Sequence, residues 1–337
     1  MQKGNAYSFS YGGTKDIELF MRKDSACVHF FQESSRSHED VISADDKLCS
    51  HTLRRIVLVS LIKYGVPFSI KNISVSINGS SKTVYDVKKD GNGEYSNPVI
   101  WSMISGKLHR PFSNTWSDKA VIETILNTTK TGEDGRYNAM IALLISKSKE
   151  FESERAMYLW MAMNGFYNYL AAEAKKTPGC NCGFTKENKK QELMCEVLEI
   201  GRIPKIDENL KDQLFKKMIA LVSHNSNGED QSILNSKALS MMQNNGISAE
   251  EENLKPMFLV WLPYQIRCNY FHANIAIPLL IHRDDKLLAV LRFCNGHVEN
   301  FIETELPKWI NTADITDEHR EMTKRALVEL QLIKKIK

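Results

Sequence analysis

The sequence contains no continuous apolar run of the eighteen or so residues that a membrane-spanning helix requires. Nothing near Met1 combines a basic start with an apolar stretch, which is the pattern of an export signal. No internal repeat of solenoid length is visible either. These absences predict a cytoplasmic protein without membrane partners and argue against a repeat architecture.

The chain also lacks a strong charge of one sign and a regular cysteine pattern. Its formal net charge of +3 is too small to indicate a nucleic-acid partner by itself. The seven cysteines are odd in number and scattered, so reduced thiols are expected rather than a disulfide framework. With 42% hydrophobic and 25% charged residues, the composition is that of a globular protein, and 337 residues are enough for about two domains.

Residues 1–130 are predicted to form a mixed α/β domain. Strands are predicted where β-branched and aromatic residues partly alternate, at 7–12, 26–31 and 68–77. A helix is predicted at 47–64, because apolar residues cluster there ahead of Gly65 and Pro67. The stretch 127–135, rich in Thr, Gly and Asp, marks the boundary.

Residues 131–337 are predicted to form a helical domain. Apolar residues recur at helical spacing over most of this region. The run 136–176 is too long for one ordinary helix and predicts two helices or one bent helix. Residues 224–252 are polar and are expected to be a loop of low order around a short helix at 234–242. Further helices of this domain are predicted at 191–200 and 210–222, from Pro256 toward Pro278, and at 284–305 and 316–333. Two more are predicted before the boundary, one starting at Pro98 and one at 118–126.

One short stretch, YQIRCNYFH at 264–272, combines features that packing alone does not explain. Aromatic and aliphatic residues frame Arg267, Asn269 and His272 at what we predict to be a helix opening. Arg267 and His272 are five positions apart, which places them about 140° apart around a regular helix. The pair therefore suits a site formed between two copies of the chain.

The chemistry of this pair favours phosphodiester cleavage. Histidine exchanges protons near neutral pH, and the planar arginine side chain binds phosphate oxygens. In RNA the neighbouring 2′-hydroxyl supplies the nucleophile, so a positioned acid or base and a cation suffice without a metal ion. Asn269 would orient the histidine or bind a phosphate oxygen.

YQIRCNYFHA, taken with ERAMYLWMAMNGFYNYL at 154–170, resembles the HEPN superfamily (higher eukaryotes and prokaryotes nucleotide-binding domains). The signature of that superfamily is an arginine, four to six residues, and a histidine at the opening of a late helix, and the matching positions here are Arg267 and His272. The resemblance covers roughly residues 136–310. Two positions depart from it, since Cys268 follows the arginine and Ala273 follows the histidine where many members have a polar residue and a glycine.

The resemblance implies a mainly α fold, an antiparallel HEPN-like helical bundle preceded by the smaller mixed α/β N-terminal domain. It also implies a metal-independent endoribonuclease that acts as a homodimer on RNA, in a toxin or phage-defence system of the Apea-like HEPN type. Arg267, His272 and Asn269 would be catalytic, and Tyr270, Asn164 and Glu154 would contact the substrate. For Glu154 and Asn164, together with Arg155, the alternatives are a supporting polar layer and a solvated helix face. No cofactor is implied.

Other interpretations remain open or are disfavoured. Some HEPN proteins only bind, so a dimeric binding module that recognises RNA, a nucleotide or a protein is the alternative function. Cys180, Cys182 and Cys195 lack a fourth ligand for zinc. Asp90–Gly93 lacks the lysine of a phosphate-binding loop. Lysines around the long helical run would favour an RNA backbone, although a solvated face is the commoner meaning; they are Lys147, Lys149, Lys175, Lys176, Lys186, Lys189 and Lys190.

Overall fold

The computed structural model divides into two compact units, each of which is described by itself. Unit 1 comprises Met1–Glu133, Lys147–Lys149 and Pro307–Ala313, and unit 2 comprises the rest of the chain. The prediction of a mainly α protein is confirmed. The structure describes residues 5–10, 16–22, 25–31, 58–65, 72–77, 80–86, 108–127, 135–180, 183–184, 186–225, 231–271, 285–310 and 317–332.

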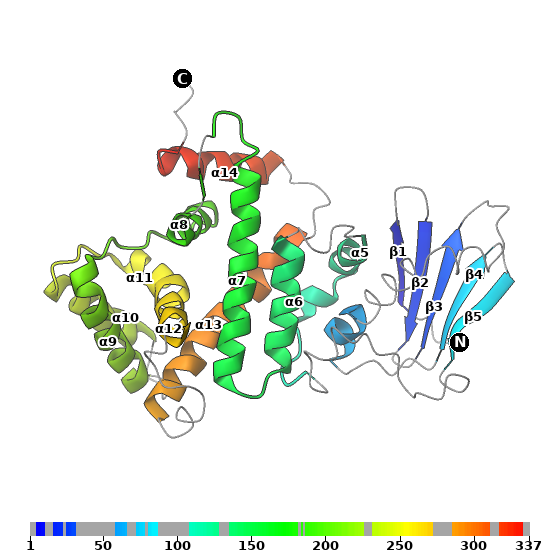
Figure 1. Ribbon diagram of the computed structural model, residues 1–337, viewed down its shortest axis with the longest axis horizontal. Coiled ribbons are helices and arrows are strands. Elements are labelled where there is room, and N and C mark those ends of the chain that lie inside the picture. Colours follow the sequence, from blue (N-terminus) through cyan, green and yellow to red (C-terminus); the bar gives the residue numbers. More distant parts are fainter. Residues whose placement is uncertain are drawn as a thin grey trace. The chain divides into compact units, whose positions relative to one another are not determined.

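Unit 1 contains a five-stranded sheet in the order β1-β2-β3-β4-β5 (Figure 1). Neighbouring strands are antiparallel except β3 and β4, which are parallel with Val28 opposite Val75. Two of the strands, β2 and β5, were not predicted from the sequence. The strands are β1 (Asn5–Ser10), β2 (Asp16–Arg22), β3 (Ser25–Phe31), β4 (Asn72–Ile77) and β5 (Ser80–Asp86).

The helices of unit 1 end and begin with the residues expected from their local chemistry. A helix over 58–64 ends at Gly65, whose φ of 64° lies in the left-handed region that glycine tolerates. Helix α5 (Lys119–Asn127) begins after Asp118, whose Oδ1 accepts a 2.9 Å bond from the N–H of Ala120. It follows a short 3₁₀ turn, η1 (Asn114–Ser117). Residues 47–57 and the helix expected from Pro98 lie outside the described residues.

Unit 2 is built from helices. The predicted run 136–176 forms two helices, with a break at 149–151, and α14 packs on both α7 and α8. The helices are α6 (Gly135–Ser148, whose last two residues belong to unit 1), α7 (Glu152–Ala174), α8 (Glu187–Val197), α9 (Glu208–Asn225), α10 (Gln231–Asn244), α11 (Leu254–Pro256), α12 (Leu262–Phe271), α13 (Asp285–Ile310, ending in unit 1) and α14 (Asp317–Glu329).

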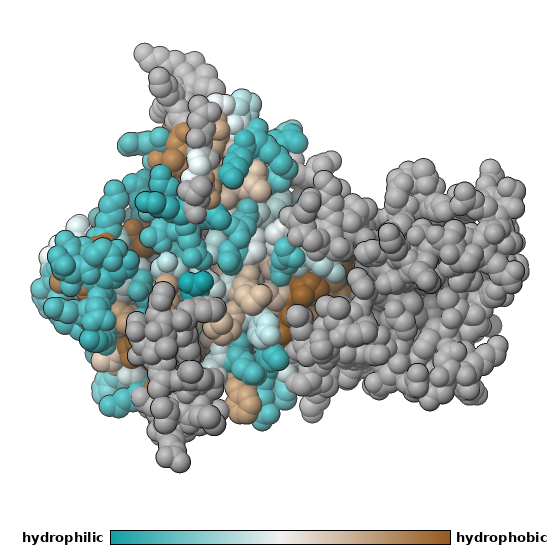
Figure 2. All heavy atoms as spheres, in the orientation of Figure 1, coloured by the Kyte–Doolittle hydropathy of each residue, from teal (hydrophilic) through white to brown (hydrophobic). Residues whose placement is uncertain are grey.

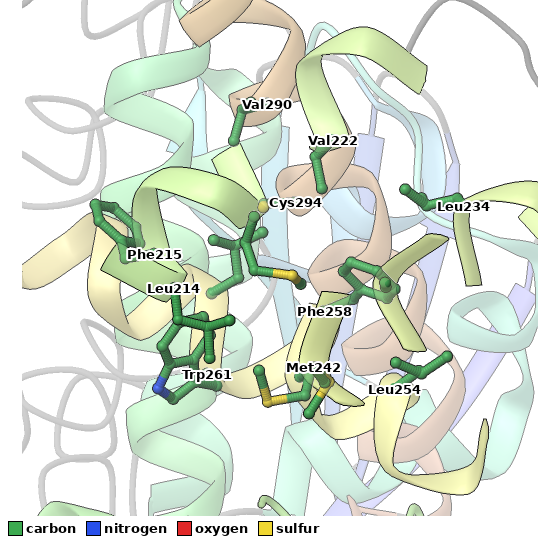
Figure 3. Close-up of a cluster of buried hydrophobic side chains, with 14 of the residues drawn as sticks. Leu214, Phe215, Val222, Leu234, Met242, Leu254, Phe258, Trp261, Val290 and Cys294 are labelled. Carbon is green, nitrogen blue, oxygen red and sulfur yellow. The ribbon is translucent and has the colours of Figure 1, made fainter. Parts of the chain in front are cut away.

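The segment 224–252 is more ordered than the sequence predicts. Helix α10 runs over fourteen of its residues. Leu234, Ala238 and Met242 lie four positions apart and are buried, while most of the other residues of the helix face solvent. This narrow apolar stripe packs into a cluster with residues of α9, α13 and the helix before α12, including Leu214, Phe258 and Trp261 (Figure 3).

The described surface of unit 2 is mostly hydrophilic on the face that Figure 2 shows. Large hydrophobic side chains that are exposed among the described residues are few: Phe151, Met161 and Ile233. The apolar residues of the helices are therefore used mainly for packing inside the unit.

Helices α6 and α7 lie side by side (Figure 1) and approach each other at two glycines. A Cβ atom on Gly165 would lie 2.8 Å from Ala139 N and 2.8 Å from Gly135 O, and both are backbone atoms. A Cβ on Gly135 would lie 2.4 Å from Gly165 O. Glycine at these positions therefore permits a backbone approach that no other residue allows.

We expect Gly165→Ala to lower the free energy of unfolding by about 1–3 kcal/mol or more, because backbone of α6 must move to admit the methyl group. Urea unfolding measures the change. The matched control is Gly296→Ala in α13, where an added Cβ meets nothing within 4 Å. That variant should be stabilised by roughly 0.5–1 kcal/mol through the lower backbone freedom of alanine. Equal stability of the two variants would contradict the proposed steric conflict.

Candidate functional site

The predicted motif does not open a helix. The helical segment begins at Leu254, passes through a π-helical turn at Met257–Trp261 and is described as far as Phe271, so Arg267 lies inside it and well after its start. Pro263 has no N–H to bond the carbonyl of Leu259, which accounts for irregular hydrogen bonding at this point. Because a π turn inserts extra chain into the helix, it changes the direction in which the following side chains, Arg267 included, project.

Arg267 lines a pocket between α7, α12 and α13. The pocket is open to solvent, and the space around its lining atoms amounts to about 390 Å³ with the solvent at its mouth included. Its walls are mostly apolar, and its polar side chains include the guanidinium of Arg267, the indole of Trp160 and the amide of Asn295. The lining residues are Ala156, Met157, Leu159, Trp160, Pro263, Ile266, Arg267, Leu291, Cys294, Asn295 and Val298.

An aromatic group from two helices lies close enough to the arginine to feel its charge. The ring of Trp160 in α7 lies 5.5 Å from the ring of Tyr264 in α12 and 6.1 Å from that of Tyr167. The Tyr167 hydroxyl donates a hydrogen bond to Glu187 of α8. Arg267 acts electrostatically on both tyrosines, and its Nη1 lies 3.9 Å from Cys268 Sγ. The site therefore joins a cation, a carboxylate and two phenols.

The two tyrosines stay protonated at neutral pH. Burial, followed by a hydrogen bond to Cys268, raises the pKa of Tyr264 to about 12, although the charge of Arg267 opposes this shift. Burial and the bond to Glu187 also raise the pKa of Tyr167. Burial likewise raises the pKa of the Cys294 thiol in the pocket wall. All three groups are therefore uncharged at neutral pH. They can form neutral hydrogen bonds but cannot serve as a general base.

A buried charge network lies beside the pocket. Arg155 of α7 donates to Glu152 Oε2 at 2.8 Å and to Glu299 of α13. Asn295 Nδ2 donates to Glu152 Oε2 at 2.7 Å and to the Glu152 carbonyl at 2.9 Å. All four side chains are buried. The network joins α7 to α13. It also holds the Glu152 carboxylate, which accepts from Asn295, in an ion pair with Arg155.

The predicted site residues have different environments. Asn269 donates from Nδ2 to the Gln265 carbonyl at 2.8 Å, so its amide nitrogen bonds its own helix. Asn164 accepts a 2.6 Å bond from Asn168. Glu154 is exposed, and it is Glu152, not Glu154, that pairs with Arg155. His272 and the side chain of Tyr270 lie outside the described residues.

Two expectations about lysine and cysteine need correction. Lys147 is buried in unit 1 and donates to the Pro111 carbonyl at 3.1 Å, so it cannot belong to a basic surface for RNA. Lys190 bonds Asn168, and Lys176 pairs with Glu173.

Cys195, Cys268 and Cys294 are free thiols as expected, but Cys180 is disulfide-bonded, so the expectation of reduced thiols is wrong for that residue.

Three residues of the site were noted in the sequence only as packing residues or not at all. Trp160 and Tyr167 were assigned to the apolar face of their helix. The signal that could have identified them as site residues is the polar N–H or O–H group that each side chain carries. Glu187 had no sequence signal, because it is distant from the motif along the chain and reaches it through Tyr167.

The residues that the structure describes include no group of three or more His, Cys, Asp or Glu that could hold a metal ion. Within those ranges, no helix is both long and apolar enough to cross a bilayer. Comparisons with protein-family models, with curated proteins and with solved structures found no match. The function must therefore be inferred from the chemistry of the residues themselves.

Proposed function

We propose that this protein is a metal-independent endoribonuclease of the HEPN type. Its active site would form between two copies of the chain, with Arg267 and His272 from each. The helices of unit 2 would be the HEPN-like bundle, and the preceding domain, residues 1–130, would sense a phage or host trigger, target the enzyme or restrain it. A cytoplasmic toxin or phage-defence effector is the corresponding role.

In this reaction the RNA 2′-oxygen attacks the adjacent phosphorus and the bond from phosphorus to the 5′-oxygen breaks. The proton of the 2′-hydroxyl passes to a base, and a proton is delivered to the leaving 5′-oxygen. The products are a 2′,3′-cyclic phosphate and a 5′-hydroxyl. His272 would move the proton, and Arg267 would bind the charge on the phosphorane oxygens.

The observation that carries the proposal is the environment of Arg267. Its guanidinium is half-buried at a pocket with apolar walls, where a contact with phosphate is less weakened by water than at an open surface. The partly exposed ring of Tyr264, which lies in the same helix as Arg267 and packs against the buried ring of Trp160, supplies a face for a base to stack on. The neutral tyrosines leave proton transfer to the histidine.

The direct test is to incubate the purified protein with a mixture of RNAs in the presence of a chelator. We expect cleavage that resists the chelator, leaves cyclic phosphate ends, and is lost in Arg267→Ala and His272→Ala variants. Sedimentation analysis of the same samples should show a dimer. Intact RNA with the wild-type protein, or a monomer with full activity, would contradict the proposal.

The second candidate function is a dimeric HEPN-like module that binds RNA, a nucleotide or a protein without cleaving. The observation that favours it is the position of Arg267 inside the helical segment that begins at Leu254, because the family signature lies at a helix opening. Binding of RNA without cleavage in the same assay would select this alternative.

A further inference from the structure

Trp160 has a polar atom that no described residue satisfies. The side chain is only 5% exposed, and its Nε1 has no hydrogen-bond acceptor among the described residues. A buried donor in this state costs about 1–3 kcal/mol relative to one that is bonded. Such groups are rare in folded proteins, so each requires an explanation. Trp160 and Arg267 line the same pocket, so the side chain with the unsatisfied N–H and the proposed phosphate cation border one space.

The pocket offers donors where an anion would need them. Indole N–H and guanidinium groups can donate hydrogen bonds but cannot accept them. The amide nitrogen of Asn295 is already bonded to Glu152, and the Glu152 carboxylate is paired with Arg155. The Cys294 thiol stays neutral, because burial raises its pKa. A group rich in acceptor oxygens therefore complements this pocket better than a cation or a purely apolar ligand.

We propose that the pocket binds a phosphate group, with Trp160 Nε1 and the Arg267 guanidinium as two donors to its non-bridging oxygens. This inference rests on the proposed function, because it takes the bound phosphate to be the RNA phosphate that is cleaved. Trp160 then contacts the charge that develops on the phosphorane, which makes it a catalytic residue beside the motif. The mostly apolar walls limit the contact of water with both hydrogen bonds and so strengthen them.

The test follows the indole N–H resonances of the full-length protein in ¹⁵N-labelled form, where the Trp160 peak is identified by its loss in Trp160→Phe. We expect a nucleoside 3′-monophosphate, and inorganic phosphate more weakly, to shift this peak, whereas the same nucleoside without phosphate leaves it unchanged. Trp160→Phe should weaken binding of the monophosphate by about 10–100-fold, as for loss of a hydrogen bond to a charged group.

The matched control is Trp261→Phe, which removes an equally buried indole of unit 2 that packs on Phe215 and lies outside the pocket. Its affinity for the monophosphate should stay within about twofold of the wild type. An equal response to the nucleoside alone would overturn the proposal in favour of a base pocket. An unmoved Trp160 peak in the wild-type protein would also overturn it, and this measurement does not depend on how well the variant folds.

The outcomes separate this inference from the proposed function. If the wild-type protein leaves RNA intact but phosphate moves the Trp160 peak, the phosphate site stands and the nuclease proposal fails. If RNA is cleaved while Trp160→Phe retains wild-type kcat and KM, the nuclease proposal stands and the role of Trp160 fails. For a role in the reaction itself, we expect kcat to fall more than KM rises.

Discussion

Replacing Arg267 with alanine is expected to lower the rate of RNA cleavage by about 10²–10³-fold, which is typical for the loss of one donor to a developing oxyanion. The guanidinium is half-buried beside the pocket of Trp160 and Asn295, where hydrogen bonds to phosphate are stronger than in bulk water. Single-turnover cleavage of a labelled RNA in chelator measures the chemical step directly.

Two further variants decide whether this loss is specific. Arg292→Ala removes the same charge from α13, next to the pocket residue Leu291, but its side chain is exposed and lies outside the pocket. It should change the rate by less than about threefold, because an exposed charge contributes only a weak, screened field. Arg267→Lys should recover little, because an ammonium group cannot form the two parallel hydrogen bonds of a guanidinium. Equal losses in Arg267→Ala and Arg292→Ala would indicate a general charge effect.

Replacing Arg155 with methionine is expected to lower the free energy of unfolding by about 3–5 kcal/mol, the cost of breaking a buried ion pair from one side. Arg155 is only 5% exposed and bonds both Glu152 and Glu299. Methionine fills most of the space but leaves two buried carboxylates without their cation. Urea unfolding at neutral pH, followed by the fluorescence of the tryptophans, measures the change.

The matched control for this variant is Arg202→Met. Arg202 also meets two carboxylates, Glu196 at 3.7 Å and Glu329 at 3.5 Å, but its side chain is 72% exposed. Its loss should cost less than about 1 kcal/mol, because water already solvates most of the arginine side chain and screens both pairs. A stability loss in Arg155→Met no larger than in Arg202→Met would show that the buried network does not stabilise unit 2. Adding Glu299→Gln to Arg155→Met should restore part of the stability by removing one uncompensated charge.

The helical part of the fold was predicted well, because local spacing determines it. The apolar residues of α7, α8 and α9 recur with the helical period, and Gly65 ended its helix where expected. Strand β2, with charged residues at Asp16, Glu18 and Arg22, was missed, because its sequence signal is weak and its pairing with β1 and β3 is made in space. Helix α10 was underestimated for a similar reason, since only its narrow apolar stripe is buried.

The candidate site could be predicted only in part. Arg267 was found because arginine in an aromatic frame is unusual, and the structure places it at a pocket. The prediction that it lies at a helix opening is wrong, because the helical segment starts at Leu254 and contains Pro263 in its interior. Asn269, whose amide was expected to act on the histidine or on phosphate, donates to its own helix. The sequence could not show which of Glu154 and Glu152 belongs to the site, because both are glutamates. Only the structure shows that Glu152 is buried and Glu154 is exposed.

By itself the sequence determined the mainly helical class, the aromatic character of α7 and the presence of Arg267, because side-chain chemistry and helical periodicity are local properties. Tertiary structure alone decided that Trp160 and Arg267 line one pocket, and that Glu187 and Glu299 are engaged by Tyr167 and Arg155. These relations depend on how α7, α8, α12 and α13 pack. Packing joins residues far apart in the chain, and no local pattern encodes which of them meet.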